Sequence, residues 1–164
     1  MGSVFGCFRV APKGKGPAAM GGSGESLTLH ASAVAIGGRG VLLLGPSGAG
    51  KSALALALIG RGAALVADDR VTLGRAGDAL LARAPDALAG LIEARGVGIL
   101  RMPAMPEVPL ALAVDLGRPP SARMPHPATI THLGVDIELI SGREVPNLDV
   151  IVTIYLHNGR AFSE

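Results

Sequence analysis

The segment GPSGAGKS, residues 45–52, carries the residue types that bind the phosphates of a nucleotide. It matches the pattern G-x-x-x-x-G-K-[ST] in full. Glycines in such a segment let the backbone curl until successive N–H groups converge on one anion. The Lys51 ammonium can then reach the β- and γ-phosphates, and the Ser52 hydroxyl can bind magnesium. The predicted phosphate-binding loop consists of Gly45, Pro46, Ser47, Gly48, Ala49, Gly50, Lys51 and Ser52.

The flanks of this loop favour phosphate binding over its main alternative, a glycine-rich turn that only caps a helix. The apolar run VLLL, residues 41–44, precedes the loop and predicts a strand. Residues 51–59 are strong helix formers and are followed by Gly60 and Gly62, which are typical of a helix end. The positive end of that helix dipole would point at the same anion.

Two carboxylates, Asp68 and Asp69, follow the short apolar segment AALVA, residues 63–67. If that segment is a strand parallel to and beside residues 41–44, both carboxylates emerge at the sheet edge that carries the loop. One could then hold magnesium through water while the other accepts a proton from an attacking hydroxyl. The alternative is a pair of solvated turn residues, for which Asp-Asp is an ordinary composition.

Three further side chains are weaker candidates when they are considered alone. Glu93 offers an oxygen ligand for a metal, and Arg95 offers a cation for the transferring group. His30 falls in the middle of a predicted strand, where a single histidine is more often structural than functional. The other histidines, His126, His132 and His157, show no spacing typical of metal ligands.

The elements that must position these groups predict an α/β fold with a mixed sheet and flanking helices. A strand, a helix and a second strand around the loop form the minimal parallel crossover unit. We predict hairpins over residues 26–44 and 71–84, a helix over 85–96, strands near 97–102, 109–116, 135–140 and 148–156, and an irregular loop over 118–127.

Composition limits the classes of protein to which the chain can belong. Its 164 residues suit one domain, and its apolar residues are aliphatic, with one Tyr, three Phe and no Trp. Fifteen basic against thirteen acidic residues, without long basic runs, argue against nucleic-acid binding. A single cysteine, Cys7, and the absence of a signal-peptide pattern predict a cytoplasmic protein away from the membrane. We expect residues 1–25 to be a flexible tail and residues 26–164 to be the catalytic domain.

Taken together, the segments LHASAVAIGGRGVLLLGPSGAGKSALALALIGRGAALVADDRV and LIEARGVGIL resemble the catalytic domain of bacterial HPr kinase/phosphorylase. Three features match jointly: a strand with a histidine that leads into the loop, the sequence VADDR after its helix, and the form E-x-R-G-x-G-I. The resemblance implies a P-loop fold like that of HPr kinase and phosphoenolpyruvate carboxykinase, with ATP and Mg2+ as cofactors.

The resemblance also implies roles for individual residues. The implied reaction is phosphorylation of a seryl hydroxyl on HPr, the phosphocarrier of the sugar phosphotransferase system, together with the reverse phosphorolysis. Asp68 would be the general base, Ser52 and Glu93 would surround magnesium, and His30 and Asp69 would support the active site. The last two candidates implied by the resemblance are Arg95, in the signature segment, and Arg143, in a loop that contacts the protein substrate.

Two departures indicate the short, alphaproteobacterial form of this family. We expect no additional N-terminal domain, and the segment after the signature, residues 100–115, has fewer glycines than usual. Aliphatic surfaces allow self-association of the chain. Two alternative functions stay open: a P-loop kinase that acts on a small molecule, and a nucleotide-binding regulator without transfer activity.

Overall fold

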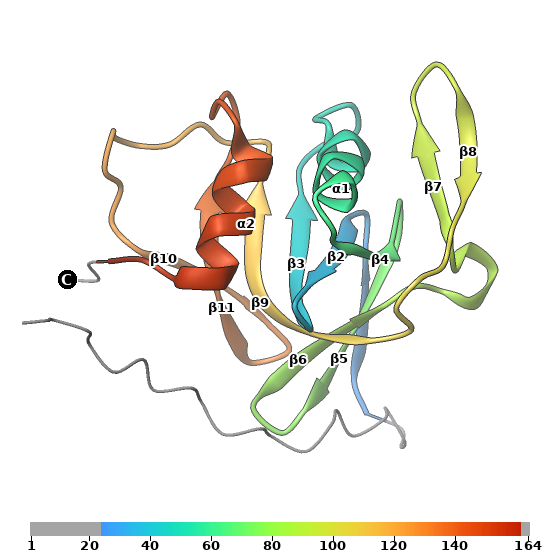
Figure 1. The fold of residues 1–164 in the computed structure, drawn as a ribbon. Coiled ribbons are helices and arrows are strands. Elements are labelled where there is room, and N and C mark those ends of the chain that lie inside the picture. The colour runs from blue at the N-terminus through green and yellow to red at the C-terminus, as the bar shows by residue number, and fades with distance from the viewer. Residues whose placement is uncertain (1–23, 162–164) are drawn as a thin grey trace, which may run out of the picture.

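A computed structural model describes residues 24–161, which form a mixed main sheet, a separate two-stranded hairpin and two helices (Figure 1). Residues 1–23, which make up most of the predicted tail and include Cys7, lie outside the described residues. The elements in chain order are β1 (Ser26–Leu29), β2 (Ser32–Ile36), β3 (Arg39–Leu44), α1 (Lys51–Gly60), β4 (Ala64–Ala67), β5 (Val71–Ala76), β6 (Ala79–Arg83), a 3-10 turn (Asp86–Leu88), β7 (Leu91–Ala94), β8 (Gly98–Arg101), β9 (Val108–Asp115), β10 (Ala128–His132), β11 (Val135–Ser141) and α2 (Leu148–Asn158).

The main part of the sheet has the strand order β10-β11-β9-β3-β2-β4. Strands β3, β9 and β11 are parallel, whereas β2 is antiparallel to both β3 and β4. The expected parallel relation of β3 and β4 is therefore confirmed, but β2 lies between them, so they are not neighbours. Their carboxyl ends still meet at one edge of the sheet, which is the edge on which the predicted site depends.

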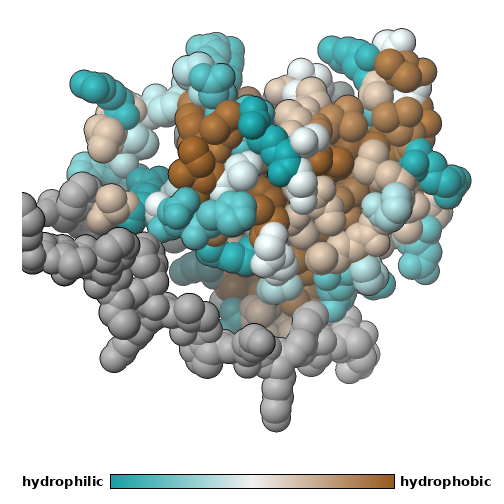
Figure 2. Space-filling view, in the orientation of Figure 1, coloured by the Kyte–Doolittle hydropathy of each residue, from teal (hydrophilic) through white to brown (hydrophobic). Residues whose placement is uncertain are grey.

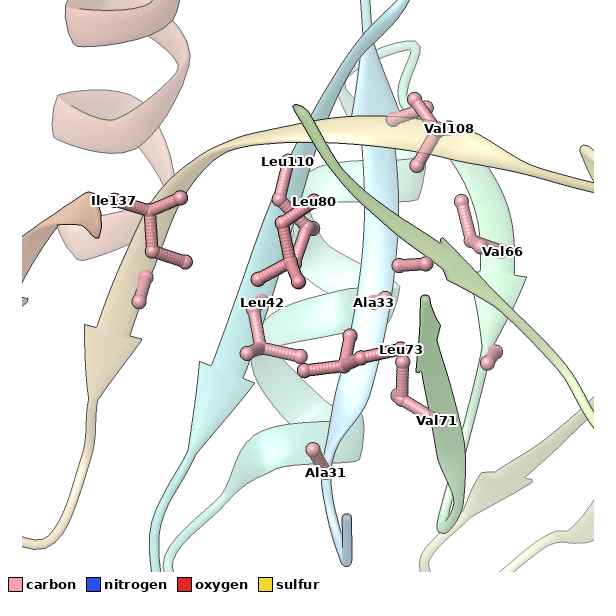
Figure 3. Close-up of a cluster of buried hydrophobic side chains, with 14 of the residues drawn as sticks. Ala31, Ala33, Leu42, Val66, Val71, Leu73, Leu80, Val108, Leu110 and Ile137 are labelled. Atoms are coloured by element: carbon pink, nitrogen blue, oxygen red, sulfur yellow. The ribbon is translucent and has the colours of Figure 1, made fainter. Parts of the chain in front are cut away.

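The two faces of this sheet are covered by different kinds of structure (Figure 1). Helices α1 and α2 cover one face, while β5 and β6 fold across the other. Strand β3 shows the division, because Val41 and Leu43 pack toward the helices and Leu42 packs toward Leu73 and Leu80 (Figure 3). Both cores are aliphatic, as the composition predicts.

Helix α2 corrects the prediction of a strand at residues 148–156. The segment is rich in β-branched residues, yet Leu148, Val152 and Leu156 recur every four residues and are all buried on one side of the helix. At its first turn, Asp149 accepts a hydrogen bond from Arg61 at 2.5 Å, which lowers the pKa of that carboxyl. Packing against the α1 side of the sheet thus overrides local strand preference.

The segment from residue 85 to residue 96 is also not the predicted helix. After the 3-10 turn, β7 and β8 pair as an antiparallel hairpin that projects from the main sheet (Figure 1). Gly90 lies at its base with φ +74°, and a Cβ atom there would meet the Met102 carbonyl oxygen at 2.7 Å. Only glycine can occupy this position at the base of the hairpin without strain.

Most of the other predicted elements are confirmed. The β2–β3 hairpin turns at Gly37 and Gly38, both at positive φ, and the β5–β6 hairpin turns at Gly77 and Asp78. Residues 26–36 form two strands rather than one, and strand β10 was not predicted. Neither helix among residues 24–161 is long and apolar enough to cross a membrane.

Candidate active site

The predicted phosphate loop lies between β3 and α1, as its flanks indicated. Gly45, Gly48 and Gly50 all have positive φ, which lets the backbone turn sharply three times within six residues. The Lys51 side chain is buried, and its Nζ donates hydrogen bonds to the carbonyl oxygens of Gly45 and Pro46 at 2.9 and 3.0 Å. An ammonium group has three N–H bonds, so one remains for a phosphate oxygen.

A neighbouring loop supports the start of the phosphate loop. A Cβ atom at Gly45 would lie 3.2 Å from the backbone nitrogen of Gly117, in the turn after β9. That turn is held by Asp115, whose Oδ1 accepts the Gly117 N–H at 2.8 Å. The close approach explains the glycine at position 45 and fixes the loop against the end of a central strand.

The carboxylate of Asp68 is the most constrained polar group of the site. The residue is 5% exposed, and its Oδ1 accepts hydrogen bonds from the hydroxyls of Ser32 and Ser52 at 2.6 and 2.7 Å. Its Oδ2 accepts the backbone N–H of Glu93 at 3.0 Å. One carboxylate therefore ties together the start of β2, the phosphate loop and the β7–β8 hairpin.

The neighbouring carboxylate, Asp69, lies in a different environment. Its side chain is 63% exposed, its φ is +66°, and its Oδ1 lies 3.3 Å from Nδ1 of His30. Aspartate is one of the few residues that tolerate this left-handed backbone conformation. The turn points the side chain outward, whereas Asp68 points inward.

A cavity of about 640 Å³ gathers most of the predicted site residues. Its walls include Ser47, Gly48, Gly50, Lys51, Ser52, Asp68, Asp69, His30, Glu93 and Arg95. The walls do not include Gly45, Pro46, Ala49 or Arg143. Arg143 lies in the loop after β11, where its N–H donates to the Arg118 carbonyl oxygen and its side chain lies beside Glu144.

The oxygen donors in the cavity suit a magnesium ion that is bound together with a nucleotide. Among residues 24–161, no three histidine, cysteine or acidic side chains form a metal cage. Mg2+ keeps several waters and binds proteins through one or two side-chain oxygens plus substrate phosphates, so no such cage is needed. The Ser52 hydroxyl, the Asp68 carboxylate and the exposed Glu93 on β7 are the candidate donors.

Two parts of the site were not predicted from the sequence, namely Ser32 and the apolar wall of the cavity. Ser32 is fully buried at the start of a strand whose other residues are apolar. A single serine at the start of an apolar strand was the sequence feature that could have indicated a role for it. Leu88 and Leu91 line the cavity from a segment that was predicted as a helix, and Ile99 lines it from β8, which was predicted as a strand. Exposed apolar side chains gather on that hairpin, where Val97 is 78% and Ile99 is 65% exposed (Figure 2).

The fold and the site together define a P-loop protein of the mixed α/β class. The family model of the HPr serine kinase C-terminal domain matches residues 23–105. That match covers the phosphate loop, both aspartates and the β7–β8 hairpin, and the chain belongs to this family. The resemblance drawn from the sequence motifs is thereby confirmed.

Individual relatives agree with the family match. The chain is 40% identical to the HPr kinase/phosphorylase of Burkholderia lata over 148 residues, which covers 80% of this chain and 45% of that protein. It is 55% identical over 76 residues to the HPr kinase/phosphorylase of Peptoclostridium acidaminophilum, covering 46% of this chain and 25% of the relative. Among solved structures, the HPr(Ser) kinase/phosphatase of Coxiella burnetii superposes with a TM-score of 0.70 at 28% identity, covering 80% of this chain and 89% of that one. The chain spans less than half the length of these curated relatives.

Proposed function

We propose that this protein is an ATP-dependent serine kinase whose acceptor is the phosphocarrier HPr. The observation that carries the proposal is that three groups lie around one cavity. They are the phosphate loop, the Asp68 carboxylate that is hydrogen-bonded to Ser52 of that loop, and the exposed pair of Asp69 and His30. The names of the relatives supply HPr as the acceptor. The proposed catalytic domain begins at Ser26, where β1 begins.

The cavity suits a nucleotide in size and in the chemistry of its walls. Its volume of about 640 Å³ falls within the range of small-molecule sites. Backbone N–H groups at the start of α1 and the third N–H of Lys51 can donate to the phosphates. The apolar side chains of Leu88, Leu91 and Ile99 line the cavity and can cover the less polar part of the ligand. A bound Mg2+ would neutralise charge that develops on the phosphates.

The geometry supports a division of roles between the two aspartates that differs from the sequence-based hypothesis. Asp68 was the candidate base, but its oxygens already accept three hydrogen bonds and the residue is buried. Asp69 is exposed at the cavity and has a histidine beside it. We therefore assign proton acceptance to Asp69 and the orientation of Ser52 to Asp68.

The proposed transfer uses the side chains of the site, Mg-ATP and the seryl hydroxyl of HPr. The seryl oxygen of HPr forms a bond to the γ-phosphorus while the bond from that phosphorus to the leaving ADP oxygen breaks. The proton of the hydroxyl passes to the Asp69 carboxylate. Lys51 and the α1 N-terminus stabilise the charge on the phosphoryl oxygens. Arg95, on the cavity wall, is a further cation for that charge.

The direct test is to incubate the purified chain with Mg-ATP and HPr and to locate phosphoserine by mass spectrometry. We expect one phosphorylated serine, and we expect no transfer to HPr in which that serine is replaced by alanine. A catalytically impaired Lys51→Ala chain is the matched control. The absence of phosphoserine with ATP, GTP or pyrophosphate as donor would reject HPr as the acceptor.

A further inference from the structure

Ser32 is a buried hydroxyl in a place where local structure does not require one. In the described part of the chain, only three polar side chains are buried, namely Ser32, Lys51 and Asp68, and all of them belong to this site. The other residues of β2 are apolar and buried, so Ser32 interrupts a continuous hydrophobic strand. Its Oγ donates to Asp68 Oδ1 at 2.6 Å, and this bond satisfies its donor.

The local backbone directs Asp68 toward this hydroxyl. The pairing of β2 with β4 shifts between Ala33 and Val34, so that Ala33 lies opposite Ala67 and Val34 lies opposite Leu65. Val66 is the extra residue of a bulge, which turns the end of β4 and re-aims the side chains beyond it. Ser32 thus meets Asp68 across a distorted end of the sheet rather than within a regular ladder.

The hydrogen bonds impose an orientation on the Ser52 hydroxyl. A serine hydroxyl has one hydrogen, and Ser52 donates it to Asp68 Oδ1 at 2.7 Å. Its lone pairs, which are the groups that bind a metal, must therefore point away from Asp68. Because Ser32 and the Glu93 N–H fix the carboxylate from two other directions, they also fix where those lone pairs point.

We propose that Ser32 is a positioning residue for the magnesium-bound nucleotide, acting through Asp68 on the Ser52 hydroxyl. The proposal rests on the nucleotide site of the proposed function, but it does not depend on the identity of the acceptor. Partners that orient metal-binding side chains typically change metal affinity by about 10- to 100-fold when they are removed. Loss of the Ser32 hydroxyl should fall in that range.

The test measures binding of the ATP analogue AMP-PNP by calorimetry in EDTA and at increasing Mg2+. Ser32→Ala should raise the Mg2+ concentration for half-maximal binding by about tenfold or more, and it should leave the affinity in EDTA within about twofold. Ser32→Thr, which keeps a hydroxyl, should restore the Mg2+ response. Thr153→Ala removes a hydroxyl from α2, where it bonds the Asp149 carbonyl oxygen, and should change neither value.

A double-mutant cycle tests whether Ser32 acts through Asp68. In an Asp68→Asn background, Ser32→Ala should have little further effect on the Mg2+ response. Additive effects of the two substitutions would overturn the proposal, as would an equal loss of binding with and without Mg2+, or no loss at all. Failure of HPr phosphorylation alone would overturn the proposed acceptor and leave this binding result intact.

Discussion

The cavity has two sides of opposite character, an inner wall and a rim. The inner wall consists of Ser32, Lys51, Ser52 and Asp68, which are buried or half-buried and bonded to one another or to the phosphate loop. The rim consists of His30, Asp69, Glu93 and Arg95, which are exposed. Under the proposed function, the inner wall holds the phosphate donor in a fixed geometry, and the rim meets the acceptor that arrives from solvent.

The largest effect on rate is expected from the rim, at Asp69. Asp69→Asn removes the proposed proton acceptor and should lower kcat by at least about a hundredfold, with the affinity for ATP nearly unchanged. Asparagine is a fitting replacement because it also adopts the left-handed backbone conformation seen at φ +66°. Single-turnover phosphorylation of HPr measures the chemical step directly.

The distinction between the inner wall and the rim would be wrong under one combination of results. Asp69→Asn would keep nearly the kcat of the unmodified chain, while Asp68→Asn would lose kcat without losing stability. The base would then be Asp68, as the resemblance alone implies. Circular dichroism of both variants provides the structural control.

On the inner wall, Lys51→Met should reduce ATP affinity by roughly 10- to 100-fold and should also lower the rate. The ammonium donates to two loop carbonyls and has one N–H left for a phosphate, and hydrogen bonds to charged groups contribute about 1.5–3 kcal/mol each. Equilibrium binding of ATP gives the affinity, and Arg70→Met, a nearby exposed cation, serves as the control. An unchanged affinity for ATP would mean that Lys51 only stabilises the conformation of the loop.

The free energy of unfolding should differ clearly between variants of the two neighbouring aspartates. Three donors, two hydroxyls and one backbone N–H, face the Asp68 carboxylate. Asp68→Asn replaces one acceptor oxygen with an NH2 group, which should lower the free energy of unfolding by about 1–3 kcal/mol. For a domain of this size, that cost lowers Tm by about 2–4 °C per kcal/mol. Asp69→Asn should leave Tm within about 1 °C because exposed pairs contribute little. Equal shifts of Tm in thermal melts of the two variants would remove the distinction.

The smallest effect is expected at His30. Its Nδ1 lies 3.3 Å from Asp69 in a pair whose side chains are more than half exposed, so His30→Gln should lower kcat only several-fold and should leave Tm unchanged. Steady-state kinetics with HPr as the varied substrate would show whether kcat or KM carries the change. A loss as large as that of Asp69→Asn would make the pair a single functional unit.

Much of the site could be predicted because its residues lie close together in sequence. The motif at residues 45–52 and the strand end before Asp68 depend on local patterns, and both are confirmed as structural elements. The environment of the two aspartates could not be predicted in this way. It depends on Ser32 and on the Glu93 N–H, which reach Asp68 from 36 and 25 residues away in the chain.

The two helices show the same limit. Helix α1 was predicted because residues 51–59 favour a helix by themselves and a glycine-rich loop precedes them. Helix α2 was not, because its β-branched residues favour a strand when they are considered alone. Its four-residue apolar period was present in the sequence, but short apolar runs of this length fit either element.

By itself, the sequence determined the phosphate loop, its helix, the turns of the β2–β3 and β5–β6 hairpins and the family, because each depends on residues that are near neighbours in the chain. The tertiary structure alone decided that residues 148–158 are helical and that the signature segment is a projecting hairpin. It also decided that Asp68 points inward and Asp69 outward. The physical reason is that burial and long-range hydrogen bonds, which set these outcomes, outweigh local conformational preferences of a fraction of a kcal/mol per residue, about 0.7 kcal/mol at most for ordinary side chains.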